Sequence, residues 1–370
     1  MTNYNSTYKR LGDYIREVDV RNKDLRYTNL LGLSIAKKFI PSIANMVGTD
    51  LRPYKIVKHN QFAYVPVTSR NGEKITVALY TGNEPAIISQ AYVVFEIVGT
   101  CDTVETVSLQ CNQLLPEYLM MWFRRAEFDR YARYHSHGSA REVFDWEEMC
   151  NVMLPIPSIE EQRKIVTRYK AIETRIANNK QTIAKLEEAA QALYRKMFVD
   201  DVDVENLPDG WRMGCLGEVA DFAYGKMPNR NSVGNIPIYS GYAITGYTDE
   251  CSYNKSHIVV IARGDAGSGK ICLSPDKFFL TNLAIATLLK NEMMKYYLYY
   301  HLCSLDTSIL RSGSAQAQVT INSLLPFEIM IPKIVICEKF ELLIEPIQSQ
   351  VKLINKENEK LMEMLSLVMV

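Results

Sequence analysis

The chain repeats itself, and this internal duplication limits its fold more than any other feature. Four short motifs occur twice, in the same order, along its 370 residues. They are Leu11-Gly12-Asp13 and Leu216-Gly217-Glu218, the Tyr-containing segments 117–122 and 296–300, Gly138-Ser139-Ala140 and Gly313-Ser314-Ala315, and Met153-Leu154-Pro155 and Met330-Ile331-Pro332. One match would be chance, but four in one order indicate a duplication. We therefore expect two similar lobes, each with a helix at its Tyr-containing segment.

An apolar seam with alternating steps of four and three residues follows each copy. This 3.5-residue repeat, sustained over about four to five heptads, is typical of a coiled coil. The seams are Ile165, Tyr169, Ile172, Ile176, Asn179, Ile183, Leu186, Ala190, Leu193 and Met197, then Phe340, Ile344, Ile347, Val351, Ile354, Asn358, Leu361, Leu365 and Val368. Each seam holds one Asn, a residue type that fixes register at a cost in stability. Two similar seams favour pairing of the two helices; the alternative is that each helix packs separately on its own lobe.

Local signals mark where the long helices begin and where the second lobe starts. Ser158 and Glu161 fit a capping box after Pro157, whereas the second helix has Cys337-Glu338-Lys339 near its start. The connector contains Leu207-Pro208-Asp209-Gly210, which ends the first helix. Strand-forming runs occur at 75–79, 91–97 and 258–261.

These signals predict the order lobe, long helix, lobe, long helix, with both lobes of mixed α/β (α+β) class. The expected segments are a first lobe at 1–157, a first helix at 158–199, a linker and second lobe at 200–332, and a second helix at 333–370.

Composition excludes several classes of protein. The chain has no run of about 18 apolar residues, so no membrane span is expected. Its start lacks an apolar signal core, and its eight cysteines never form Cys-x-x-Cys. We expect reduced thiols, no zinc site and a cytoplasmic location. The 42 basic and 42 acidic residues balance, so any DNA contact must rest on local patches or on a basic partner.

No motif in the chain predicts catalysis or a cofactor. The run from Gly264 to Lys270 resembles a phosphate loop, but Ile271 stands where Ser or Thr belongs and a strand follows instead of a helix. We expect a hairpin turn there. The chain has no Pro-Pro pair of the methyltransferase type and no Glu-x-Lys of the nuclease type. His135 and His137 could form half of a metal site, but a solvated or DNA-facing role is favoured. We expect no catalytic, cofactor or metal residues.

Basic, aromatic and amide side chains cluster in each lobe in a way that suits phosphate and base contacts. Arg pairs well with guanine, and Asn or Gln pairs well with adenine. For each residue alone, an ordinary solvated side chain is the simpler explanation. The candidate DNA contacts are Arg124, Arg125, Arg130, Arg133, His135, His137 and Arg141 in the first lobe, and Lys226, Asn229, Arg230, Asn231, Tyr242, Arg263, Lys270, Arg311, Gln316 and Gln318 in the second.

The whole chain resembles the specificity subunits of type I restriction–modification systems. The motifs that carry the resemblance are Leu216-Gly217-Glu218, Gly138-Ser139-Ala140, Pro155-Ile156-Pro157, Glu160-Glu161-Gln162 and Leu207-Pro208-Asp209-Gly210-Trp211. The second helix departs from the pattern because it lacks Glu-Glu-Gln.

The resemblance implies that the lobes are target-recognition domains for double-stranded DNA, reading a split and asymmetric sequence. It implies that the helices form an antiparallel coiled coil with pseudo-twofold symmetry and dock two methyltransferase subunits, which motor–nuclease subunits then join. S-adenosylmethionine, ATP and Mg would be bound by those partners, and this chain would not be an enzyme. A seam of about 33 residues at about 1.5 Å each would span roughly 50 Å, or on the order of 15 base pairs.

Two rival functions remain open from the sequence. The first is a complete methyltransferase or nuclease with degenerate motifs. The second is a coiled-coil scaffold or transcription factor that binds DNA without a modification partner.

Overall fold

The computed structural model describes residues 8–42, 48–68, 74–98, 113–138, 141–229, 233–264, 267–306, 310–312 and 318–368. The chain forms two compact units. Unit 1 comprises Met1–Ala177 with Glu359–Val370, and unit 2 comprises Asn178–Asn358. Two long helices, α4 (Ile159–Phe198) and α8 (Ile334–Val368), contribute residues to both units. No helix of the described segments is long and apolar enough to cross a membrane.

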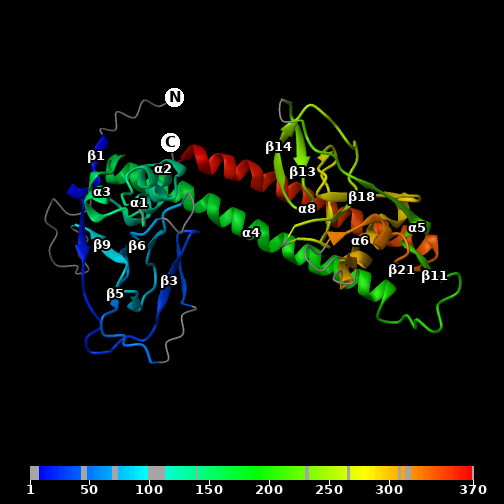
Figure 1. Cartoon of the computed structure of the whole chain (residues 1–370), viewed down its shortest axis with the longest axis horizontal. Coiled ribbons are helices and arrows are strands. Elements are labelled where there is room, and N and C mark those ends of the chain that lie inside the picture. Colours follow the sequence, from blue (N-terminus) through cyan, green and yellow to red (C-terminus); the bar gives the residue numbers. More distant parts are fainter. Residues whose placement is uncertain are drawn as a thin grey trace. The chain divides into compact units, whose positions relative to one another are not determined.

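The lobe of unit 1 is built on a four-stranded antiparallel sheet in the order β2-β9-β6-β7. Figure 1 shows its two central strands, β9 and β6. Its strands are β2 (Ile15–Val18), β9 (Val93–Ile97), β6 (Phe62–Tyr64) and β7 (Val77–Leu79). The two-stranded ribbons are β1 (Tyr8–Arg10) with β10 (Met153–Pro155), β3 (Leu31–Ser34) with β4 (Lys38–Pro41), and β5 (Lys55–Val57) with β8 (Ala86–Ile88). The short helices are η1 (Leu11–Asp13), α1 (Pro116–Phe123), α2 (Ala126–Tyr134) and α3 (Trp146–Asn151).

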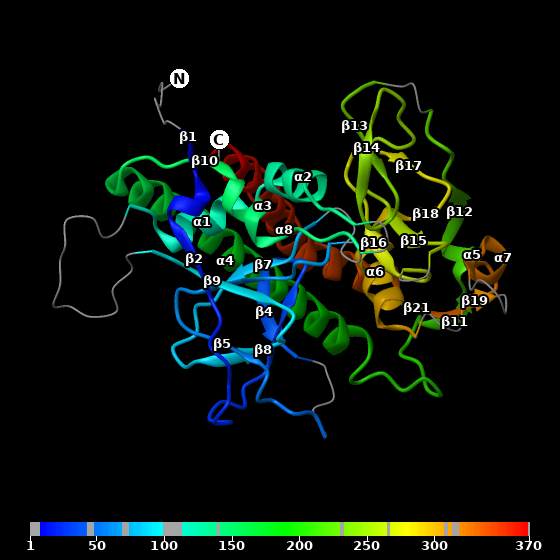
Figure 2. The same ribbon diagram turned by 60° about the vertical axis from the view of Figure 1, so that its left-hand side comes forward.

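Alternating side chains of this sheet build two apolar layers. Phe62 and Phe95 are buried neighbours on one face, with ring centroids 5.0 Å apart, and the α1 ring of Phe123 meets them edge-on. On the other face, Ala63 and Val94 pack against the β5–β8 ribbon. Figure 2 shows α1 and α3 on one side of these strands and β5 and β8 on the other. The period of two along each strand explains why both faces are covered.

The lobe of unit 2 contains a four-stranded antiparallel sheet in the order β12-β18-β15-β16. Its strands are β12 (Ala220–Tyr224), β18 (Ala284–Leu289), β15 (Ile258–Ile261) and β16 (Ile271–Leu273). A second sheet has the order β14-β13-β17, and two ribbons pair β11 with β21 and β19 with β20. These strands are β14 (Ile244–Thr248), β13 (Ile236–Tyr239), β17 (Phe279–Leu280), β11 (Arg212–Cys215), β21 (Glu328–Ile331), β19 (Arg311–Ser312) and β20 (Gln318–Val319). The short helices are α5 (Leu216–Val219), η2 (Glu292–Met294), α6 (Lys295–Ser304) and α7 (Ile321–Leu324).

The two lobes share one topology. In each four-stranded sheet the first strand along the chain pairs with the last, and the two intervening strands follow in order. In each lobe a ribbon also joins the opening strand, β1 or β11, to the strand that precedes the long helix, β10 or β21. Residues that flank the Gly-Ser-Ala motifs pair with each other, His137 with Val143 and Ser312 with Gln318. The predicted mixed α/β fold of two similar lobes is therefore confirmed.

Contacts between α4 and α8 run in opposite chain directions. In unit 2, Asn179 bonds Asn358, Glu187 bonds Gln348, and the Phe198 ring lies 5.1 Å from the Phe340 ring. Residue numbers thus rise along α4 while they fall along α8, so the pair is antiparallel.

In unit 1, residues from the two helices also share one apolar cluster. Tyr169 belongs to that core, and Ile165, Leu365 and Val368 pack against it. The predicted helix pairing is confirmed, and the alternative of two separate helices is wrong.

A buried ion pair ties α2 to the strands of unit 1. Lys37 Nζ lies 2.7 Å from Asp129 Oδ1 and also donates to the Phe123 carbonyl oxygen. Asp129 accepts a second bond from the Ile75 backbone N–H at 3.1 Å. Burial lowers the pKa of Lys37, while Asp129 opposes that shift. Since buried charges are tolerated only when paired, each partner depends on the other.

Replacing Lys37→Met is expected to destabilise unit 1 by about 3–5 kcal/mol, because the Asp129 side chain would lose its cation partner in the core. The measurement is the urea midpoint of unfolding. Lys38→Met is the matched control, since the adjacent Lys38 is exposed. Equal midpoints for the two variants would show that the ion pair is dispensable.

A partly buried histidine lies where α4 meets α6 in unit 2. His301 Nδ1 is 2.8 Å from the Tyr194 hydroxyl, and burial lowers the pKa of His301 from 6.5 to about 4. The imidazole is therefore neutral in the fold, while the unfolded chain takes up its proton at the ordinary pKa. Stability linked to His301 is present above the unfolded pKa and is lost as the pH falls toward the folded pKa.

We expect the wild-type protein to lose on the order of 2 kcal/mol more stability than His301→Gln when the pH falls from 6.5 to 4. Thermal unfolding midpoints of both proteins across this range provide the measurement. Glu341, whose pKa burial raises to about 7, titrates in the opposite sense but is present in both proteins. Parallel pH profiles for the two would contradict the assignment.

Candidate nucleic-acid interface

One turn in unit 2 gathers segments that lie far apart in the sequence. The turn Thr281–Leu283 connects β17 to β18. Asn282 N donates to the Lys226 carbonyl oxygen, and Ala262 N and Arg263 N both donate to the Leu283 carbonyl oxygen. Val319 N in turn donates to Ala262 O at 3.0 Å, which attaches the β19–β20 ribbon. The backbone therefore places Lys226, Arg263 and the strand of Gln318 around one end of the sheet.

Two further predicted residues reach the same end. The Lys270 carbonyl oxygen accepts from Ile261 N at 2.9 Å, which fixes Lys270 beside the start of the Arg263 segment. Tyr242 is 65% exposed, and its ring lies beside Gly267. Lys226, Arg263 and Lys270 are exposed, and within the described residues their side chains form no ion pair. Five predicted contacts thus meet at one end of the lobe, and three of them are cations without an ion-pair partner among the described residues.

The strands on either side of the run from Gly264 to Lys270 form a hairpin, so the run is not a phosphate loop. β15 pairs antiparallel with β16, with Val260 opposite Ile271. A strand therefore follows Lys270, where a phosphate loop would require a helix N-terminus. The predicted hairpin is confirmed.

The arginines of the first lobe divide into two groups. Arg124 Nη1 lies 2.8 Å from Glu173 Oε1 and donates to the Tyr169 hydroxyl at 3.3 Å, so it holds α1 against α4. Arg125 stacks on the Trp122 ring at 4.5 Å and pairs with Glu127.

The second group faces solvent. Arg130 on α2 is exposed and has only a long contact of 3.4 Å to Glu127, and Arg133 and Arg141 are exposed as well. Tyr134, at 84% exposure, lies next to Arg133 on the same helix end. The solvent-facing arginines are therefore better placed for an external partner than Arg124 and Arg125.

His135 and His137 converge on one carboxylate. His135 Nδ1 is 3.1 Å and His137 Nε2 is 3.6 Å from the two oxygens of Glu148, which lies on α3. The His135 ring also stacks on Tyr131 at 4.2 Å. In the described residues no cluster of three His, Cys, Asp or Glu side chains could hold a metal ion. The two histidines thus link the end of α2 to α3 beside the exposed arginines.

Four predicted contacts have limited or no structural description. Arg230, Asn231 and Gln316 lie outside the described residues, and so does the side chain of Arg311 in β19. Asn229, the last described residue before the gap at 230–232, is exposed. The DNA-contact assignments of all the residues named above stay predictions.

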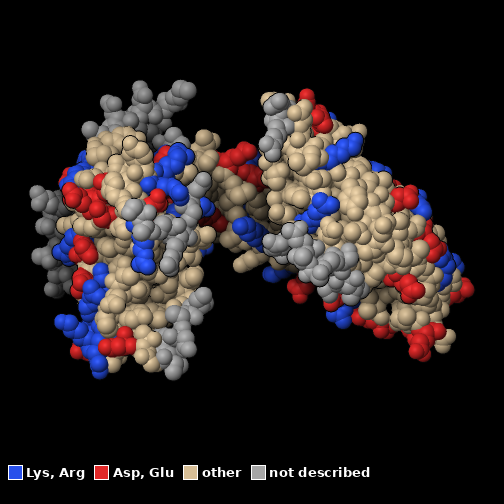
Figure 3. Space-filling view, in the orientation of Figure 1, with Lys and Arg blue, Asp and Glu red and all other residues tan. Residues whose placement is uncertain are grey.

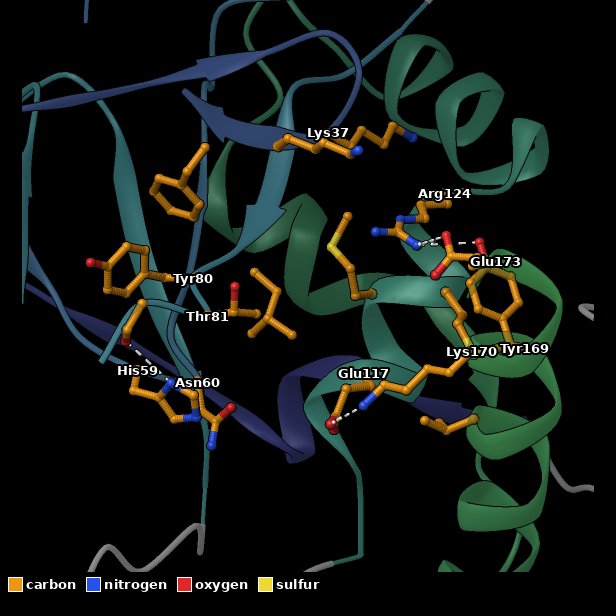
Figure 4. Close-up of a pocket in the computed structure, with 17 residues that line it drawn as sticks. Lys37, His59, Asn60, Tyr80, Thr81, Glu117, Arg124, Tyr169, Lys170 and Glu173 are labelled. Atoms are coloured by element: carbon orange, nitrogen blue, oxygen red, sulfur yellow. Dashed lines mark hydrogen bonds and ion pairs between the residues drawn. The ribbon is translucent and has the colours of Figure 1, made fainter. Parts of the chain in front are cut away.

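A pocket in unit 1 was not anticipated from the sequence. Its volume is about 570 Å³, and Figure 4 shows His59, Asn60, Tyr80 and Thr81 on one wall facing a wall from α1 and α4. On the second wall, Lys170 pairs with Glu117 at 2.9 Å and Arg124 pairs with Glu173. Lys37 and Asn60, both in the lining, have the left-handed backbone conformation, with φ of 58° and 64°. The lining comes from five separate chain segments, so no local motif marks it.

Charge is distributed differently over the two units. In Figure 3 basic and acidic side chains intermingle on the visible face of unit 1. Much of the visible face of unit 2 is uncharged, with a few Lys and Arg within it and most acidic side chains toward its lower and right edges. The Lys and Arg side chains on this face of unit 2 are therefore set within an uncharged surface.

Known proteins share this organisation. Residues 208–363 match the family model described as the type I restriction modification DNA specificity domain. The type I restriction enzyme MjaIX specificity subunit of Methanocaldococcus jannaschii is 24% identical, with 66% of this chain and 65% of that protein covered. The HindI specificity subunit of Haemophilus influenzae is 24% identical, with 51% of this chain and 40% of that protein covered. The chain thus spans less than two thirds of the length of either relative.

A solved structure has the same fold. It is the S subunit of a type I restriction–modification system from M. genitalium, with a TM-score of 0.60 and 15% sequence identity, covering 100% of this chain and 96% of that chain. The resemblance to type I specificity subunits that the repeated motifs predict is confirmed.

Proposed function

We propose that this chain, a relative of type I restriction–modification specificity subunits, reads a split DNA sequence and directs partner subunits to it. Each lobe contacts one half of the target in the major groove, and the helix pair docks two methyltransferase subunits, which motor–nuclease subunits then join. The chain itself carries no catalytic site, and its partner subunits bind S-adenosylmethionine, ATP and Mg.

The observation that carries the proposal is the group of free cations around Thr281–Leu283. Phosphate contacts require Lys or Arg whose charge is not already neutralised, and as far as the chain is described Lys226, Arg263 and Lys270 meet that condition. The strand of Gln318 lies beside them, and a Gln amide can bond adenine through two hydrogen bonds. Cations that position the backbone and amides that read base edges are the two components of sequence-specific binding.

The lobes share a topology but present different side chains, which supports an asymmetric target. The first lobe offers Arg130, Arg133 and Arg141 from α2 and the loop that follows it. The second lobe offers residues from turns at the end of a sheet. Because direct readout depends on the side chains at base edges, lobes that differ in this way recognise different half-sites.

The outer surface of α8 supports a docking role for the helices. In unit 2 this helix exposes Leu342 to 77%, Leu353 to 65%, Leu343 to 49% and Val335 to 47%. Along α4, whose residues are all described, no large hydrophobic side chain is comparably exposed. Exposed apolar patches of this kind mark interaction surfaces.

A methylome tests the proposed function. The chain is co-expressed with the methyltransferase encoded beside its gene, and host DNA is sequenced for modified bases. The expected result is one new split motif with a fixed gap, which is absent when either protein is omitted. A stable complex without a new motif would contradict DNA recognition. Absence of any complex would favour the coiled-coil scaffold or transcription factor.

The free cations of unit 2 can be tested with a matched charge control. Lys226→Ala/Arg263→Ala/Lys270→Ala should weaken binding to the split target and lower the slope of log affinity against log salt by about 2–3, because each lost phosphate contact removes about 0.9. The control replaces Lys255, Lys277 and Lys290 with Ala, since these side chains lie toward the opposite ends of β15, β17 and β18. Equal slopes for the two triple variants would refute the assignment.

A further inference from the structure

We propose that the buried Asn179–Asn358 pair selects the helix partner: it favours α4 with α8 of one chain over α4 with α4, and α8 with α8, of a second copy. Asn179 Nδ2 donates to Asn358 Oδ1 at 2.9 Å and to Glu357 Oε2 at 3.0 Å. The two Asn residues are only 5% and 7% exposed. Both N–H groups of the Asn179 amide are therefore satisfied inside the seam.

A second copy competes because the duplication gives both helices the same seam. When Ile165 is aligned with Phe340, each following seam position of α4 through Leu193 falls on a seam position of α8. An α4 helix from another copy could therefore replace α8 as far as spacing and apolarity are concerned. The Asn residues break this equivalence, because the alignment matches Asn179 with Ile354 and Ile183 with Asn358.

The register decides what each buried amide meets. With Asn179 opposite Asn358, the next seam step places Ile183 opposite Ile354. A like pair can be formed by replacing one helix with the other according to the alignment of Ile165 with Phe340. Two antiparallel α4 helices would then place each Asn179 opposite Ile183. Two antiparallel α8 helices would place each Asn358 opposite Ile354. Every Asn would then be buried against a methyl surface. An unpaired buried amide is costly, so such pairings are selected against.

Contacts between helices and lobes also influence pairing, and the test must hold them constant. In unit 2, Tyr194 and Phe198 of α4 pack with Tyr297 and Tyr300 of α6. The test compares three versions of the chain that keep these contacts and differ only in whether, and where, the seam contains a pair of Asn side chains. They are the wild type, a pair-removed variant (Asn179→Ile/Asn358→Ile) and a pair-relocated variant (Asn179→Ile/Ile183→Asn/Ile354→Asn/Asn358→Ile).

Each full-length protein carries a protease site inserted after Val204, which is 67% exposed in the connector. The folded chain is cleaved there, the halves are given time to exchange, and native mass spectrometry separates mixed from like pairs by mass. Circular dichroism and a thermal melt confirm that each version remains folded.

The wild type and the pair-relocated variant are expected to stay as mixed pairs. The pair-removed variant should show a share of like pairs at least about tenfold higher, because the amides no longer penalise them. Equal shares in the wild type and the pair-removed variant would overturn the proposal. It would also fail if the pair-relocated variant behaved like the pair-removed one, because the position of the amides would then not matter.

Discussion

Neither lobe completes its apolar core without side chains from both long helices. In unit 2 the core cluster includes Tyr194 and Phe198 of α4 together with Phe340 and Ile344 of α8. In unit 1, Tyr169 of α4 lies in the core and Leu365 and Val368 of α8 pack against it. The antiparallel helix pair is therefore a structural requirement of each unit and not an appendage. Because the hydrophobic effect scales with buried apolar area, loss of the pairing would expose core surface in both units.

This requirement explains why polar residues in and beside the seam are so fully bonded. Gln162, which is 0% exposed at the start of α4, donates to the carbonyl oxygens of Gln113 and Pro157 and accepts from Leu115 N. Asn179 donates to Asn358 Oδ1 and to Glu357 Oε2. Buried amides stabilise one arrangement mainly by penalising every other, since a displaced partner leaves an unsatisfied group. The polar residues thus add specificity to an association that apolar burial makes stable.

Periodic features could be predicted from the sequence, whereas features that depend on distant segments could not. The seams, the duplication and the strand 258–261 follow from local spacing, which backbone geometry fixes. Arg124 and Arg130 look alike in the sequence. Only the fold shows that Arg124 forms a hydrogen bond with Glu173 whereas Arg130 is exposed. The pocket beside His59 and the cluster around Thr281–Leu283 were not recognised, because each is assembled by contacts between segments far apart in the chain.

Overall neutrality and a DNA role are compatible in this chain because its charges are unevenly distributed and differ in their partners. Lys255 pairs with Glu292 and Lys352 pairs with Asp276, whereas the cations at Thr281–Leu283 face no carboxylate among the described residues. Contacts from these three cations would release few counterions, so under the proposed function the isolated chain would bind any DNA weakly. Discrimination would then rest on base contacts more than on charge. Strong binding would require the partner subunits, which makes target recognition and complex assembly interdependent.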